Sequence, residues 1–110
     1  MPHSLRKLLL DLKISCEEIQ TFSMGKDFLQ FSEDRLLQLA IEREFEIIGE
    51  ALSRLERVDP ENIGIKIPEF KKIIGFRNIL AHGYDIIDEA SLWDFVQNRI
   101  PELLAQLESY

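Results

Sequence analysis

Apolar residues recur every three or four positions along most of the chain, which is the spacing of one face of an α-helix. In residues 4–22 the apolar positions that follow this spacing are Leu5, Leu8, Leu9, Leu12, Cys16 and Ile19. Ser4 stands where an N-cap is expected, and the stretch Ser23-Met24-Gly25 ends the pattern. No segment alternates apolar and polar residues long enough to predict a β-strand. The pattern therefore predicts an all-α protein.

A long second helix is predicted from about Ser32, as its N-cap, to Val58, with Asp59-Pro60 as its end. Acidic residues follow Ser32 in the first turn, where the helix dipole favours negative charge. The positions expected on its buried faces are Leu36, Leu37, Ala40, Phe45, Ile48, Ala51, Leu52 and Leu55.

Residues 59–67 read as a connector, and Pro68 suits the first turn of a third helix because no amide donor is needed there. This helix is expected to run to Ala81 or His82, with Gly83 as its terminator. A fourth helix opens at 88–89, and Pro101 either kinks it or starts a fifth. The predicted fold is a small up-and-down bundle of four to five helices, formed by a single domain over residues 1–110.

Composition narrows the class of protein. With 110 residues and 45% hydrophobic content, the chain builds only a modest core, so that a dimer would help to bury apolar surface. Cys16 is the only cysteine, which excludes an intramolecular disulfide and a zinc site built from cysteine pairs. The apolar run Leu8-Leu9-Leu10 is too short for a signal peptide or a membrane span. We expect a cytoplasmic protein with no membrane partner.

The net charge of −7 argues against nucleic-acid binding by the whole surface. The charges are unevenly distributed, because residues 32–61 carry nine acids and four bases, whereas residues 62–84 carry four bases and one acid. One interpretation is that both stretches are ordinary solvated helix faces. The other is that Lys66, Lys71 and Lys72 contact RNA phosphates next to the stretch that follows them.

That stretch is Arg77-Asn78-Ile79-Leu80-Ala81-His82-Gly83-Tyr84, which combines a permanent cation, an amide, an imidazole and a phenol. On a regular helix Asn78 and His82 share a face, whereas Arg77 and His82 diverge by about 140°. One straight helix therefore does not bring Arg77 and His82 together on a small substrate. Either the helix ends near His82 and redirects the imidazole, or two protomers combine their groups in one site.

The Arg-x4-His-x-Tyr pattern, with Asn after the arginine, resembles the signature of the HEPN ribonucleases, and more narrowly the HepT toxins. The resemblance extends over nearly the whole chain, through Glu46-Ile47-Ile48-Gly49-Glu50-Ala51, the Pro68-led helix and Trp93. It implies a homodimer whose two motifs line a shared cleft, catalysis without a metal or other cofactor, and a cognate minimal nucleotidyltransferase as antitoxin. It also implies that Tyr84 is the residue to which this partner adds AMP.

The residues suit cleavage of an RNA phosphodiester by its own 2′-hydroxyl, which leaves a 2′,3′-cyclic phosphate and spares DNA. His82 is the only imidazole of the motif, and because histidine is the side chain type that ordinarily titrates near neutrality, it is the candidate acid and base. Arg77 offers a fork of donors to phosphate oxygens, and Asn78 either orients His82 or contacts the phosphate. The RNA target, tRNA or mRNA, is not determined by the sequence.

Each candidate also has an ordinary structural interpretation. Arg77 can pair with an acid of the long helix, His82 can stabilise a helix C-terminus, and Tyr84 can be a half-buried aromatic. At the level of function, the alternative is a non-catalytic helical adaptor that only binds a nucleotidyltransferase. The repeat of Glu42, Glu46 and Glu50 is interpreted as a solvated or partner-facing stripe, and Gly49 as a point of close approach by another helix.

Overall fold

The computed structural model describes residues 3–82 and 89–110, with side chains described at 4–79 and 89–110. The described residues form helices and short connections and no strand, so the prediction of an all-α fold is confirmed. The elements are α1 His3–Ser23, α2 Phe28–Glu33, α3 Arg35–Val58, α4 Pro60–Lys66, α5 Phe70–His82, α6 Glu89–Asp94, a π-helical segment η1 Phe95–Arg99, and α7 Ile100–Glu108.

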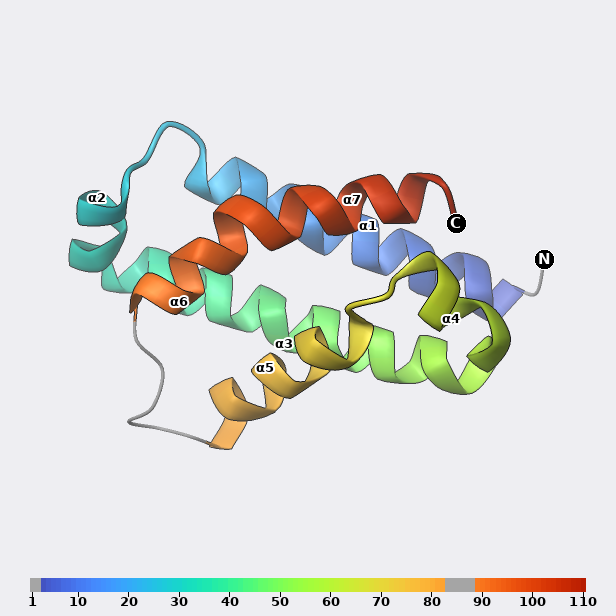
Figure 1. Cartoon of the computed structure of the whole chain (residues 1–110). Helices are drawn as coiled ribbons and strands as arrows, with labels where there is room; N and C mark the ends of the chain where they lie inside the picture. Colours follow the sequence, from blue (N-terminus) through green and yellow to red (C-terminus); the bar gives the residue numbers. More distant parts are fainter. Residues whose placement is uncertain (1–2, 83–88) are drawn as a thin grey trace.

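The long helix α3 forms the centre of the bundle (Figure 1). Helix α1 packs along one side of α3, α5 packs on another side, and α7 runs along α1. The fully buried side chains that join these helices include Leu12, Ile19, Phe31, Ile41, Phe45, Ile48, Leu52, Leu55, Ile63, Ile67, Ile100 and Leu103. No helix in the described part of the chain is long and apolar enough to cross a membrane.

The start of α3 differs from the sequence prediction. Asp34, rather than Ser32, caps this helix, because its carboxylate accepts a hydrogen bond of 3.0 Å from the backbone N–H of Leu37. Ser32 lies inside the short helix α2, where its hydroxyl donates to the carbonyl of Leu29. Leu36 consequently lies in the first turn of α3, where its side chain is 78% exposed, so its assignment to the buried face was wrong.

The segment expected as a connector contains a helix. Pro60 opens α4, where its missing amide donor costs nothing, and Glu61 lies in the first turn. The end of the chain is held beside this helix, since the Tyr110 hydroxyl donates to Asp59 over 2.7 Å and Lys66 Nζ donates to the Ser109 carbonyl over 3.3 Å. The signal for α4 was present in Asp59-Pro60-Glu61, but it was interpreted only as a helix end.

Helix α5 begins at Phe70, so the assignment of Pro68 to its first turn was wrong, because Pro68 and Glu69 form a turn before it. The helix ends at His82, as predicted. The expected terminator Gly83 and the expected helix opening at Asp88 lie outside the described residues. Pro101 is the second residue of α7 and follows the π-helical segment η1. The wider π turn accommodates a proline that provides no amide donor, so Pro101 marks the start of a new helix.

Candidate functional site

Helix α5 is anchored by the aromatic residue that precedes the arginine of the motif. The ring of Phe76 stacks on Phe95, with centroids 4.3 Å apart, and meets the edge of Phe45 at 5.5 Å. Phe45 belongs to α3 and is almost fully buried. This three-ring cluster fixes the rotation of α5 about its axis, and that rotation directs the next residue, Arg77, toward α3.

Arg77 crosses α3 at Gly49. A Cβ atom at position 49 would lie 2.5 Å from Arg77 Cβ and 3.1 Å from Arg77 Cδ, so only a glycine permits this crossing. The prediction that Gly49 allows close approach of another helix is therefore confirmed, and the approaching helix is α5 of the same chain.

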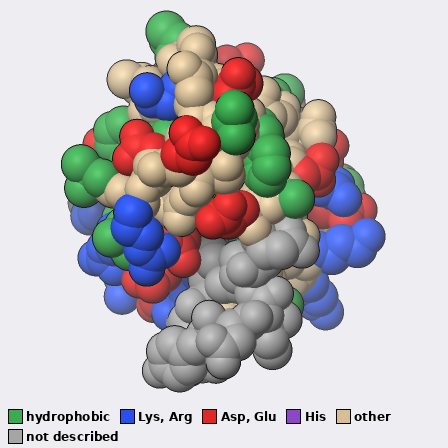
Figure 2. Space-filling model, turned by 90° about the vertical axis from the view of Figure 1, so that its left-hand side faces the viewer, with side chains coloured by type: hydrophobic (Ala, Val, Ile, Leu, Met, Phe, Trp, Pro, Cys, Tyr) green, Lys and Arg blue, Asp and Glu red, His purple; other side chains and the backbone are tan. Residues whose placement is uncertain are grey.

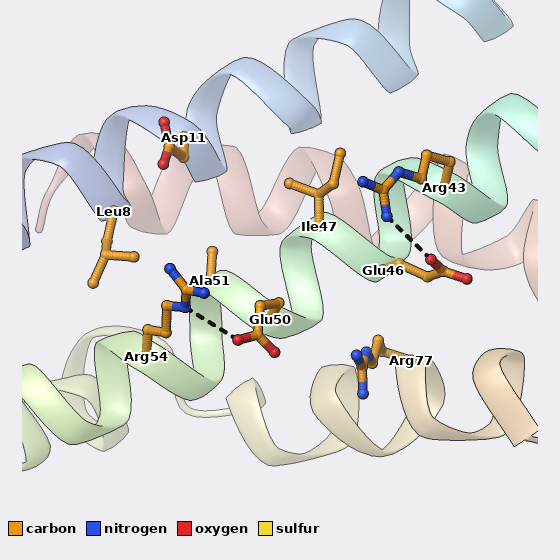
Figure 3. Close-up of a pocket in the computed structure, with 9 residues that line it drawn as sticks. All are labelled: Leu8, Asp11, Arg43, Glu46, Ile47, Glu50, Ala51, Arg54 and Arg77. Atoms are coloured by element: carbon orange, nitrogen blue, oxygen red, sulfur yellow. Dashed lines mark hydrogen bonds and ion pairs between the residues drawn. The ribbon is translucent and has the colours of Figure 1, made fainter.

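The Arg77 side chain lines a groove of about 330 Å³ between α1, α3 and α5 (Figure 3). The other lining residues are Leu8, Asp11, Arg43, Glu46, Ile47, Glu50, Ala51 and Arg54. Two of the carboxylates in the groove form ion pairs with arginines of the same helix, α3: Glu46 with Arg43 at 3.3 Å, and Glu50 with Arg54 at 3.1 Å. The groove therefore combines neutralised acids with the cation of Arg77.

Arg77 forms no ion pair with an acidic side chain in the part of the chain that the structure describes. Its Nη1 donates a hydrogen bond of 3.0 Å to the side-chain oxygen of Asn78, and its buried Nε has no hydrogen-bond partner. The ordinary interpretation, in which Arg77 pairs with an acid of the long helix, is therefore wrong. The guanidinium therefore keeps hydrogen-bond donors that no acid among the described residues uses.

Asn78 and Ile79 lie on the exposed side of α5, next to the turn that carries Arg77. The backbone is still helical at His82, but the side chain of His82 and all of Tyr84 lie outside what the structure describes. The structure thus brings together Arg77 and Asn78. The assignments of His82 and Tyr84 stay predictions.

The three lysines proposed to contact RNA lie in different surroundings. Lys66 reaches the end of the chain at Ser109, Lys72 pairs with Glu69 at 2.9 Å, and Lys71 Nζ lies 6.0 Å from the centre of the Phe70 ring. Lys71 and Lys72 are exposed at the start of α5, whereas Lys66 lies at the end of α4 (Figure 1). The lysines therefore do not form one cluster around Arg77.

Figure 2 shows the end of the bundle at which α2 lies. Lys and Arg side chains gather toward the sides of this face, and acidic side chains lie between them. The described surface that is visible on this face is therefore mixed in charge.

The acidic repeat on α3 is neutralised by neighbouring arginines. Arg35 lies 3.8 Å from Glu42, and Arg54 pairs with Glu50 at 3.1 Å. Sequence reasoning did not place Arg43 and Arg54 near the motif, although their spacing from Glu46 and Glu50 puts them on the same helix face. The described residues contain no group of three or more His, Cys, Asp or Glu side chains arranged to hold a metal ion.

A cluster of three ionisable side chains, Cys16, Glu18 and Glu44, lies between α1 and α3, together with Ser15. Burial and the neighbouring Glu18 carboxylate raise the pKa of Glu44 from 4.5 to about 7, opposed by a hydrogen bond from Ser15 and by the charge of Arg43. Burial also raises the pKa of the Cys16 thiol to about 12, with a further contribution from Glu44. The thiol is therefore held in its unreactive protonated form.

In the described part of the site, Arg77 lies in a groove beside Asn78 and has no acidic partner. A guanidinium in this setting suits an anionic ligand. The family model for HepT-like ribonucleases matches residues 12–110. The chain belongs to the HepT-like ribonuclease family.

Several curated proteins are similar over most of their length. The “Probable ribonuclease HepT” of Thermococcus cleftensis is 32% identical over 98% of this chain and 96% of its own. A “Putative RNase” of Methanocaldococcus jannaschii is 32% identical over 94% of both chains, and one of Caldanaerobacter subterraneus is 34% identical over 84% of this chain and 81% of its own. No solved structure matches the chain at a significant level.

Proposed function

We propose that this protein is an RNA endonuclease toxin that cleaves without a metal ion, with Arg77 and His82 as its catalytic residues. The observation that carries the proposal is Arg77, whose guanidinium lines a groove and has no acidic partner among the described residues. Membership of a ribonuclease family and the curated relatives named as ribonucleases supply the substrate class, which is RNA.

The reaction is an internal transfer of the phosphoryl group. A base takes the proton of the 2′-hydroxyl, the 2′-oxygen attacks phosphorus, the bond from phosphorus to the 5′-oxygen breaks, and an acid returns a proton to that oxygen. The products are a 2′,3′-cyclic phosphate and a 5′-hydroxyl, and no water is consumed. His82 is the acid and base, and Arg77 stabilises the charge that develops on the phosphate oxygens. Asn78, which accepts a hydrogen bond from Arg77, holds the guanidinium and contacts the phosphate.

The working enzyme is a homodimer. Arg77 faces α3, whereas Asn78 is exposed, and helical periodicity assigns position 82 to the face of Asn78. Within one chain, Arg77 and His82 therefore start from different sides of α5. Two copies that pair near the ends of their α5 helices supply both groups to one phosphate, and their two His82 residues divide the roles of acid and base.

The same site is the target of inhibition. A cognate minimal nucleotidyltransferase acts as antitoxin and transfers AMP to the Tyr84 hydroxyl, as in a type VII toxin–antitoxin pair. The added phosphate occupies the region where Arg77 receives the RNA phosphate, and its charge and bulk exclude the substrate. If Tyr84→Phe is still fully neutralised by the co-expressed partner and carries no AMP, this part of the proposal fails.

The nuclease proposal is tested by incubating the purified chain with total RNA in EDTA, with wild type beside His82→Ala and Arg77→Ala. Wild type should yield fragments with cyclic phosphate ends. His82→Ala should be slower by about 10²–10⁴-fold, and Arg77→Ala by about 10²–10³-fold. Products that end in a 3′-hydroxyl refute the mechanism. Intact RNA in all lanes, from folded protein free of AMP, favours a non-catalytic adaptor instead.

A further inference from the structure

Helices α3 and α5 approach each other closely where Arg77 crosses Gly49. The two nearest Arg77 atoms to a Cβ at position 49 would be Cγ and Cβ, the latter at 2.5 Å, with Cδ at 3.1 Å. Non-bonded carbon atoms pack best at about 3.5–4.0 Å, so an alanine at position 49 requires a movement of roughly 1 Å.

A rotation of the arginine side chain alone cannot provide this movement. Arg77 Cβ is fixed to the backbone of α5, and the preceding Phe76 is held between Phe45 and Phe95. A methyl group at position 49 must therefore separate the two helices or turn α5 about its axis. Either change moves the guanidinium relative to the groove.

The charged groups beside the contact make the position of the guanidinium important. Glu46 and Glu50 lie on α3 on either side of Gly49, and each is paired with an arginine of its own helix. Arg77 lies between these two ion pairs, with Nε buried and Nη1 held by Asn78 (Figure 3). The depth to which Arg77 enters the groove thus determines how many of its donors point toward a bound anion.

We propose that Gly49 is a positioning residue for Arg77, whose absent side chain provides the space in which the arginine lies. The inference rests on the proposed function, in which Arg77 binds the phosphate that is cleaved. It adds a residue of α3, 28 positions earlier in the chain, to the determinants of catalysis.

The test compares Gly49→Ala with Gly64→Ala and Arg77→Ala in the full chain. Gly64 is the matched control, because it is also helical and a Cβ there would meet only Phe70 Cε1, at an ordinary 3.9 Å. Three properties are measured: thermal unfolding, cleavage of total RNA in EDTA, and the NMR signal of the Arg77 Nε–H group, assigned by its absence in Arg77→Ala.

Gly49→Ala should remain folded, lose about 100-fold in cleavage rate, and shift the Arg77 Nε–H signal. Gly64→Ala should leave the rate and the signal unchanged. Full activity of Gly49→Ala overturns the inference, and so does a loss of activity with an unchanged Arg77 signal. If Arg77→Ala cleaves RNA like wild type, the proposed function fails instead, while the Nε–H signal still tests the contact.

If Gly49→Ala does not fold, the double variant Gly49→Ala/Arg77→Gly decides the question, because glycine at position 77 removes all three conflicting atoms. Recovery of the fold to the level of Arg77→Gly alone supports the contact as the cause. No recovery overturns the inference.

Discussion

The raised pKa of Glu44 makes the stability of the α1–α3 contact depend on pH. In the unfolded chain this carboxyl group has its ordinary pKa of 4.5, whereas in the folded protein the pKa is about 7. Between these values the folded protein holds a proton that the unfolded chain releases. The stabilisation is therefore complete below the unfolded pKa and is lost as the pH rises through the folded pKa.

The size of the effect follows from the shift. At about 1.4 kcal/mol per pKa unit, the change from 4.5 to about 7 sets a ceiling of about 3.5 kcal/mol. Glu18, the partner in this interaction, is exposed, and water screens part of the repulsion. We expect the Glu44 contribution to lower the free energy of unfolding by about 1–2 kcal/mol between roughly pH 5 and pH 8.

The perturbation is Glu44→Gln, which stays neutral in both states. Urea unfolding followed by circular dichroism gives the free energy of unfolding of wild type and variant at each pH. The difference between them should change by about 1–2 kcal/mol in favour of the variant as the pH rises, because groups that titrate elsewhere cancel. Ser15→Ala should enlarge the pH dependence, since the Ser15 hydrogen bond favours the ionised form. A difference that is constant across this range refutes the reasoning.

Three further predictions use the same unfolding measurement or a related one. Asp34→Ala should lower the free energy of unfolding by about 1 kcal/mol, because it removes the N-cap of α3. Ser32→Ala should lower it by less than half as much, and equal losses for the two variants would contradict the assigned cap. Tyr110→Phe should lower the free energy of unfolding by about 1 kcal/mol through loss of the hydrogen bond to Asp59, and an unchanged midpoint would show that this bond contributes nothing. Phe76→Ala should lower the free energy of unfolding by about 3 kcal/mol and also reduce RNA cleavage, because the ring fixes the rotation of α5. A destabilised variant with full activity would show that the aromatic cluster does not control the position of Arg77.

The lengths of the main helices were predictable because they depend on local signals. The apolar spacing of residues 4–22 corresponds to α1, and the pair Asp59-Pro60 ends α3 where expected. The end of α5 at His82 was also predicted. One error lies at the start of α3, where the short helix α2 was not predicted and the N-cap was placed at Ser32 instead of Asp34. The other lies at α4, where a proline that starts a helix was interpreted only as a stop.

The sequence by itself determined that the chain is helical, which residues carry the candidate chemistry, and which family it resembles. These depend on the period of 3.6 residues per turn and on the order of side chains, both of which are local. Only the tertiary structure decided that Arg77 crosses α3 at Gly49, that Arg43 and Arg54 occupy the acids beside it, and that Arg77 itself has no acidic partner among the described residues. The physical reason is that the rotation and spacing of packed helices are set by contacts between residues far apart in the chain, such as Phe45, Phe76 and Phe95.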